Sequence, residues 1–130
     1  MSPWIALVTL LCVLLMSGCM FAVGLGRARH GVHAPATAGH PDFERLYRVQ
    51  MNTLEASVMF LPALWIAASH GDARWAAGFG AVWLVGRVLY AVGYAKDAKR
   101  RGAGFLIGLV ALAALLVQGG WGVVAALRAG

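Results

Sequence analysis

Long apolar runs alternate with short polar stretches along the whole chain. Each of four runs is near the roughly 20 residues that a helix needs to cross a hydrocarbon core about 30 Å thick. The links between them are short, apart from a stretch rich in Pro, Gly and Thr between the first two runs. Short links favour antiparallel neighbours. The pattern predicts one domain, residues 1–130, folded as an all-α antiparallel bundle of four transmembrane helices. The expected spans are residues 3–25, 43–69, 73–95 and 104–127.

Composition supports a membrane protein and changes how the charge is interpreted. Hydrophobic residues make up 61% of the chain and charged residues only 12%, outside the usual balance of a soluble domain. The chain has 11 Lys and Arg against 5 Asp and Glu. No basic stripe interleaved with aromatic residues lies on a polar scaffold, so nucleic acid is not expected as a partner. The basic charge is better explained by membrane topology.

Lys and Arg concentrate around two of the three loops. The second loop has only Arg74, and the C-terminal end only Arg128. Because cytoplasmic loops carry the excess of positive charge, loops one and three are expected in the cytoplasm and both termini on the opposite side. The residues that carry this signal are Arg27, Arg29, Arg45 and Arg48 around the first loop, and Lys96, Lys99, Arg100 and Arg101 in the third.

Two ionisable residues lie too deep for topology to explain them. Glu55 is about twelve residues, or roughly 18 Å, into the second span. Arg87 precedes Lys96 by nine residues, or roughly 13 Å. At such depth a charged side chain faces the bundle interior or a water-filled cavity and indicates a functional site.

Spacing assigns these two residues to polar stripes. At about 100° per residue, four polar residues of the second span fall within roughly 80°, and four of the third within roughly 60° if that helix continues far enough. If the two stripes face each other, they predict a water-filled crevice between the second and third spans. An ion pair between Glu55 and Arg87 that locks the bundle is an alternative, but it leaves surplus cations for an anionic ligand. The stripes are Arg45, Arg48, Asn52 and Glu55, and Arg87, Tyr90, Tyr94 and Arg101.

Two features bear on oligomerisation. Gln50 points about 140° away from Arg45, so it reaches the ligand only if the pocket lies between chains or wraps around the second span. Gly104 and Gly108 form a G-x-x-x-G pattern that permits close helix contact, either between chains or within one chain.

Four histidines are candidate metal ligands. His30, His33 and His40 share the first loop, with Asp42 as the one carboxylate at ligand spacing, whereas His70 lies at the opposite face. No metal is expected.

Two blocks of sequence resemble a known membrane family. The segments FERLYRVQMNTLE, residues 43–55, and GRVLYAVGYAKDAKRR, residues 86–101, are similar to the membrane-associated proteins in eicosanoid and glutathione metabolism, the MAPEG family. This family includes microsomal glutathione transferases, leukotriene C4 synthase and the 5-lipoxygenase activating protein. The resemblance implies a bacterial inner-membrane homotrimer of four-helix protomers, with glutathione bound near the cytoplasmic side between subunits.

The resemblance also implies roles for individual residues. Arg101 matches the arginine that stabilises the glutathione thiolate, with support from Tyr90 or Tyr94, although the register leaves Arg100 as a competing candidate. Glutathione carries two carboxylates, which can pair with arginine guanidinium groups, and one ammonium group, which can pair with Glu55. The implied glutathione contacts are Arg27, Arg48, Gln50, Asn52, Glu55, Arg87, Tyr90 and Tyr94.

The function expected from the resemblance is that of a membrane glutathione transferase, with or without an additional glutathione peroxidase activity. A thiol with a free pKa near 8.5 becomes nucleophilic at neutral pH when a cation favours the thiolate. Glutathione as co-substrate is then sufficient, without a metal or redox cofactor. The second substrate would be a hydrophobic electrophile or a lipid hydroperoxide that enters from the membrane lipid.

Departures from the family pattern keep alternatives open. Ala28 replaces a second arginine and Ala56 an aromatic residue, both typical of members that make leukotrienes. One alternative is a member that binds glutathione or lipid without catalysis. The other is a small channel or transporter that uses the polar crevice as its path.

Overall fold

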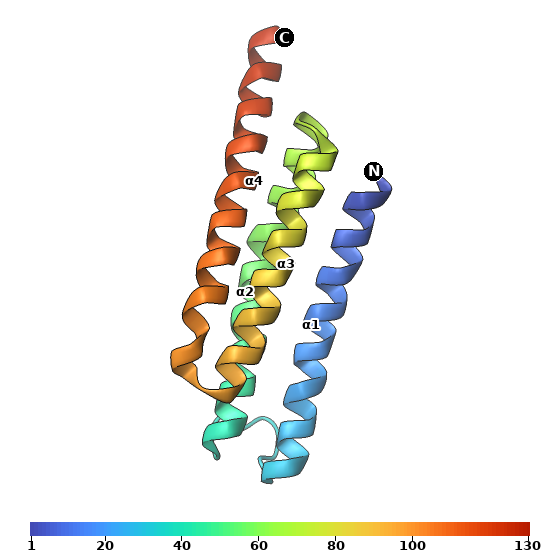
Figure 1. Ribbon diagram of the computed structural model, residues 1–130. Helices are drawn as coiled ribbons and strands as arrows, with labels where there is room; N and C mark the ends of the chain where they lie inside the picture. The colour runs from blue at the N-terminus through green and yellow to red at the C-terminus, as the bar shows by residue number, and fades with distance from the viewer.

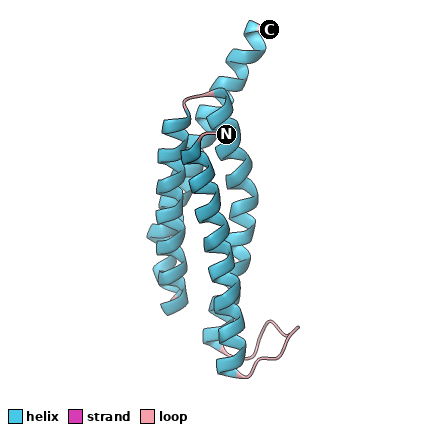
Figure 2. Cartoon of the chain, turned by 90° about the vertical axis from the view of Figure 1, so that its right-hand side faces the viewer, coloured by secondary structure: helices cyan, strands magenta, loops and turns pink.

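The computed structural model describes all residues from Met1 to Gly130, and it consists of helices without any strand. The predicted all-α four-helix fold is confirmed. All four long helices have the length and apolar composition to cross a membrane. They lie side by side along one direction, with α4 projecting beyond the others at its C-terminal end (Figures 1 and 2). The elements are α1 Pro3–His30, α2 Pro41–His70, α3 Ala73–Lys96, the 3-10 helix η1 Ala98–Arg101, and α4 Gly102–Ala129.

Local capping explains where three of the long helices begin. Pro3 follows a capping Ser2, whose Oγ accepts a hydrogen bond from the backbone N–H of Trp4. His40 caps α2 through Nδ1, and Asp72 caps α3 through Oδ1. At the other end of α1, the left-handed backbone of Gly31 (φ 65°) stops the helix beyond the predicted end of the first span.

The junction between α3 and α4 decides whether Arg101 shares the polar stripe of the third helix. The third helix does not continue to Arg101, because Asp97 leaves the helical conformation and its carboxylate caps η1 by accepting from the N–H of Lys99. Arg101 therefore reaches its neighbours on a short 3-10 turn rather than on the stripe of α3. Beyond it, α4 begins at Gly102.

The largest apolar core joins the four long helices in the half of the bundle that lies away from the first and third loops. Its largest members are Trp83 and Phe60, whose rings are stacked with centroids 3.8 Å apart. Trp83 is thus a core residue. Outside this core most large apolar side chains are exposed, including Phe21 at 68% and Val117 at 73%. In a water-soluble protein such a surface would be a liability, whereas lipid is its natural solvent.

Small residues bring α3 and α4 into backbone contact. A Cβ placed on Gly104 would lie 2.3 Å from the Tyr90 backbone nitrogen and 2.6 Å from the Gly86 oxygen. A Cβ on Gly86 would lie 2.7 Å from the Gly108 nitrogen. Of the two alternatives for the G-x-x-x-G pattern, Gly104 and Gly108 therefore pack within one chain.

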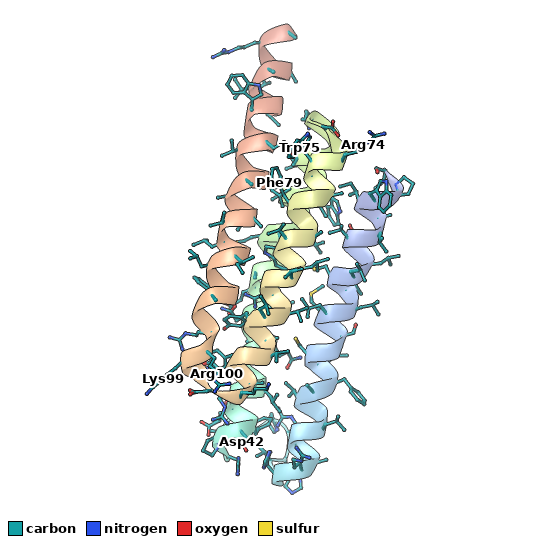
Figure 3. The ribbon with its side chains drawn as sticks, in the orientation of Figure 1. Asp42, Arg74, Trp75, Phe79, Lys99 and Arg100 are labelled. Carbon is teal, nitrogen blue, oxygen red and sulfur yellow. The ribbon has the colours of Figure 1, made fainter.

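Charge is distributed unevenly between the two ends of the bundle. Lys99 and Arg100 lie at the α3–α4 turn, at the same end as Asp42 (Figure 3). Arg74 and Trp75 lie at the opposite end, where α3 begins (Figure 3). The end that carries the first and third loops is strongly basic, which places the polar site described next at the basic end.

Candidate functional site

A cavity of about 420 Å³ opens between α2, α3 and the start of α4. It gathers three of the four residues of each predicted stripe despite the break after α3, whereas Arg45 and Arg87 do not line it. Arg48 and Glu55 are exposed within it, whereas Tyr90 is buried. The cavity is lined by Arg48, Met51, Asn52, Glu55, Tyr90, Tyr94, Arg101 and Phe105.

Alternating cations and aromatic rings form a row from Arg87, which lies beside the cavity, to Arg101, which lines it. The Arg87 guanidinium lies 4.3 Å from the Tyr90 ring centroid, and the Tyr90 and Tyr94 centroids are 5.6 Å apart. At the outer end, the Arg101 guanidinium lies 5.7 Å from the Tyr94 centroid. Such cation–π contacts orient the cation without using its N–H donors. Arg101 is thereby held at the cavity while its donors stay free for an anion.

The ion pair considered between Glu55 and Arg87 is not formed. Arg87 is buried, and its Nη2 donates a 2.9 Å hydrogen bond to Thr53 Oγ1 instead. A neutral hydroxyl on the inner face of α2 replaces the carboxylate as the partner. Glu55 therefore remains without an ion-pair partner in the protomer.

Two buried polar atoms near the cavity have no hydrogen-bond partner in the protomer, namely Asn52 Oδ1 and Arg87 Nε. An unpaired buried donor or acceptor costs on the order of 1–3 kcal/mol. Their positions next to the cavity suit a polar ligand that supplies the missing partners.

A second, smaller cavity of about 130 Å³ continues from the first toward the middle of the bundle. The two share Asn52, Glu55 and Phe105. Beyond these residues the wall is mostly apolar, with Met59, Leu109 and Leu112 among its members, and Arg87 is the one further charged residue that lines it. A polar, open compartment is thus joined to an apolar one at membrane depth.

Three residues singled out from the sequence lie away from this cavity. Arg27 donates a 2.7 Å hydrogen bond to the Ala36 oxygen and stacks on Phe43. Gln50 is half-buried on another face of α2. Arg45, expected in the same stripe as Arg48, donates instead to the Ala95 oxygen and pairs with Asp42.

Sequence reasoning missed two polar residues that support the site. Thr53 holds Arg87, and Ser57, one turn further, contacts the Cys12 thiol at 3.5 Å. Both are buried on the inner face of α2. Their i, i+4 spacing is the signal that could have identified them. They were missed because a hydropathy pattern hardly separates small hydroxyl side chains from apolar ones.

The loop between α1 and α2 brings together the ligand atoms of His30, His40 and Asp42, which all lie within 4.8 Å of one another. His33 is not part of this cluster. Two of the donors are already engaged, since His40 Nδ1 caps α2 and Asp42 pairs with Arg45.

Comparison with known proteins places this geometry in a family. The model of the MAPEG family matches residues 5–121. An uncharacterized protein of Synechocystis sp. is 48% identical over 88% of this chain and 83% of its own length. Human microsomal glutathione S-transferase 2 is 37% identical over 89% of this chain and 82% of its own length, and bovine leukotriene C4 synthase is 42% identical over 85% and 78%. With its four long apolar helices, this chain is therefore an integral membrane protein that belongs to the MAPEG family.

Proposed function

We propose that the protein is a membrane glutathione transferase that conjugates glutathione to hydrophobic electrophiles. The observation that carries this proposal is the gathering of Arg48, Asn52, Glu55, Tyr90, Tyr94 and Arg101 around one open cavity. A ligand with two carboxylates, one ammonium group and a thiol matches its two exposed arginines and its single carboxylate. The name of the human relative, a glutathione S-transferase, supports the same chemistry.

The proposed reaction needs one activated sulfur. Arg101 favours the thiolate form of bound glutathione, and the thiol proton leaves to solvent. The thiolate then attacks an electrophilic carbon, for example that of a chlorodinitrobenzene, so that a carbon–sulfur bond forms and chloride leaves. Tyr90 lies in the same cavity as a hydroxyl donor to the sulfur. The apolar second cavity is the proposed approach for the electrophile.

The proposed assembly is a homotrimer in which Arg27 and Gln50 contact glutathione held by a neighbouring protomer. Both residues lie outside the cavity of their own protomer, and the cavity itself is open on the side of Arg48 and Glu55. An open polar site at membrane depth is costly unless a neighbour covers it.

Glu55 provides a test of the binding mode. Replacing it in Glu55→Gln should weaken glutathione binding roughly tenfold, because a charge-assisted hydrogen bond to the ligand ammonium is lost. Calorimetric titration of the detergent-purified protein measures this. Glu44→Gln, an exposed acid outside the cavity, is the matched control. With N-acetyl glutathione, which lacks the ammonium, the variant and the wild type should bind alike; a persistent tenfold difference would contradict the assigned partner.

The proposed orientation places the basic end of the bundle in the cytoplasm. The Ala38→Cys variant, changed in the first loop, should react with a membrane-impermeant maleimide only after cell lysis, whereas the Arg128→Cys variant should react in spheroplasts. The native Cys12 and Cys19 are buried and serve as an unreactive background. The reverse labelling pattern would show that the orientation is inverted.

A further inference from the structure

A second basic cavity lies at the same end of the bundle, between α1, α2 and the end of α3. Its volume is about 950 Å³, and it is separate from the proposed glutathione cavity, since the two share no lining residue. Its cations are Arg29, Arg45 and Lys96. Arg45 is committed to Asp42 and the Ala95 oxygen, whereas Arg29 and Lys96 form no ion pair within the protomer. Asp42 is the one acid in the lining, so two uncompensated cations remain.

An apolar track leads from this cavity toward the middle of the membrane. The cavity shares Leu25 with a hollow along α1, and that hollow shares Leu14 with a groove of about 500 Å³ between α1 and α3. The groove is lined entirely by hydrophobic side chains. Along α1, Leu25 and Leu14 are separated by about 16 Å of helix rise, close to half the thickness of a hydrocarbon core.

Glycines hollow the surface along this track. A Cβ on Gly18 or Gly24 would meet nothing within 4 Å, and both residues line the hollow that joins the groove to the basic cavity. The space is therefore open rather than filled by neighbouring side chains of the protomer.

We propose that this continuous surface binds one anionic phospholipid, with its phosphate at Arg29 and Lys96 and an acyl chain along the α1–α3 groove. Free cations at the lipid–water boundary attract an anionic headgroup. The apolar track directly below them accepts a chain but offers nothing to a free anion. The site does not depend on the proposed transferase activity, because none of its residues lines the glutathione cavity.

The test uses the full-length purified protein and native mass spectrometry with dioleoyl phosphatidylglycerol and dioleoyl phosphatidylcholine as probes. The wild type should retain phosphatidylglycerol and not phosphatidylcholine. The double variant Arg29→Gln/Lys96→Gln should bind phosphatidylglycerol roughly tenfold more weakly, because two headgroup contacts are lost. The matched control Arg74→Gln/Arg128→Gln removes the same charge from the opposite end and should bind like the wild type. Equal retention by both double variants would overturn the proposal.

Two further arms distinguish a lipid from other occupants. Gly24→Leu fills the track without a clash inside the protomer and should also lower phosphatidylglycerol retention. If instead it dissociates the oligomer, this surface of α1 is a subunit interface and the lipid assignment is wrong. Glycerol 3-phosphate, which has the phosphate and no chain, should not displace the lipid at millimolar concentration; full displacement would reduce the site to one for a free phosphate.

Discussion

Conjugation of glutathione to a chlorodinitrobenzene should fall about 10²- to 10³-fold in the Arg101→Ala variant, while glutathione binding changes much less. A fall in rate of this size is typical when an enzyme loses one hydrogen-bond donor that stabilises an anion in the reaction. Arg101 is held at the cavity by the Tyr94 ring, and its N–H groups form no hydrogen bond within the protomer. Its loss removes thiolate stabilisation rather than the carboxylate contacts of the tripeptide.

Arg100 supplies the matched control for this experiment. It is adjacent in sequence, carries the same charge and lies at the α3–α4 turn (Figure 3), but it does not line the cavity. Arg100→Ala should keep nearly the full rate. Turnover is followed by the absorbance of the conjugate and binding by titration of the same preparation. A rate that falls in Arg100→Ala and persists in Arg101→Ala would transfer the role to Arg100. Binding without turnover in the wild type would favour a non-catalytic member of the family.

The Gly104→Ala variant should be destabilised by about 3 kcal/mol, the upper range for a group forced into a filled site. The added methyl would lie 2.3 Å from the Tyr90 nitrogen, and that atom belongs to a helix backbone that no rotamer change can move. The two helices must separate. Because Tyr90 and Phe105 line the proposed site from these two helices, glutathione binding should weaken as well.

Gly102→Ala is the control for helix propensity in this pair. It lies two residues earlier, has helical dihedrals, and its added methyl would meet nothing within 4 Å. This change should be neutral or stabilising by up to about 1 kcal/mol, since Ala is the better helix former. Unfolding in mixed detergent micelles, monitored by far-ultraviolet circular dichroism, compares the two. A Gly104→Ala protein as stable as Gly102→Ala would show that α3 and α4 do not approach this closely.

Helical periodicity accounts for the part of the site that a single regular helix builds. Arg48, Asn52 and Glu55 lie on one face of α2 and line one cavity, as their spacing predicts. The same method adds Arg101 to the stripe of α3 only if that helix continues so far, and α3 ends at Lys96. The reason is local: the Asp97 carboxylate caps a new turn and ends the periodicity. Hydropathy does not register such a cap, because one short acid amid basic residues looks like ordinary loop sequence.

Pairing of charges was harder to predict than position. Glu55 and Arg87 have opposite charge at similar depth, yet Arg87 bonds to Thr53. From sequence, the expected partner of a charged residue is the nearest opposite charge. In the folded bundle, the partner is instead a residue whose side chain points toward the same interior space. Thr53 points at the core and Glu55 toward the open side of α2. Contacts across a subunit boundary, such as those proposed for Arg27 and Gln50, depend on an assembly that no single-chain periodicity encodes.

The two joined cavities give the substrates of the proposed reaction different concentration scales. Glutathione enters the polar cavity from water, so its occupancy there depends on its aqueous concentration. An electrophile that enters through the apolar compartment is supplied from the bilayer, where its concentration is set by its partition coefficient. Two compounds of equal chemical reactivity would then be consumed at unequal rates solely because one dissolves better in lipid. For the proposed transferase, rates with different electrophiles should therefore be compared at equal mole fraction in the membrane rather than at equal molarity in the buffer.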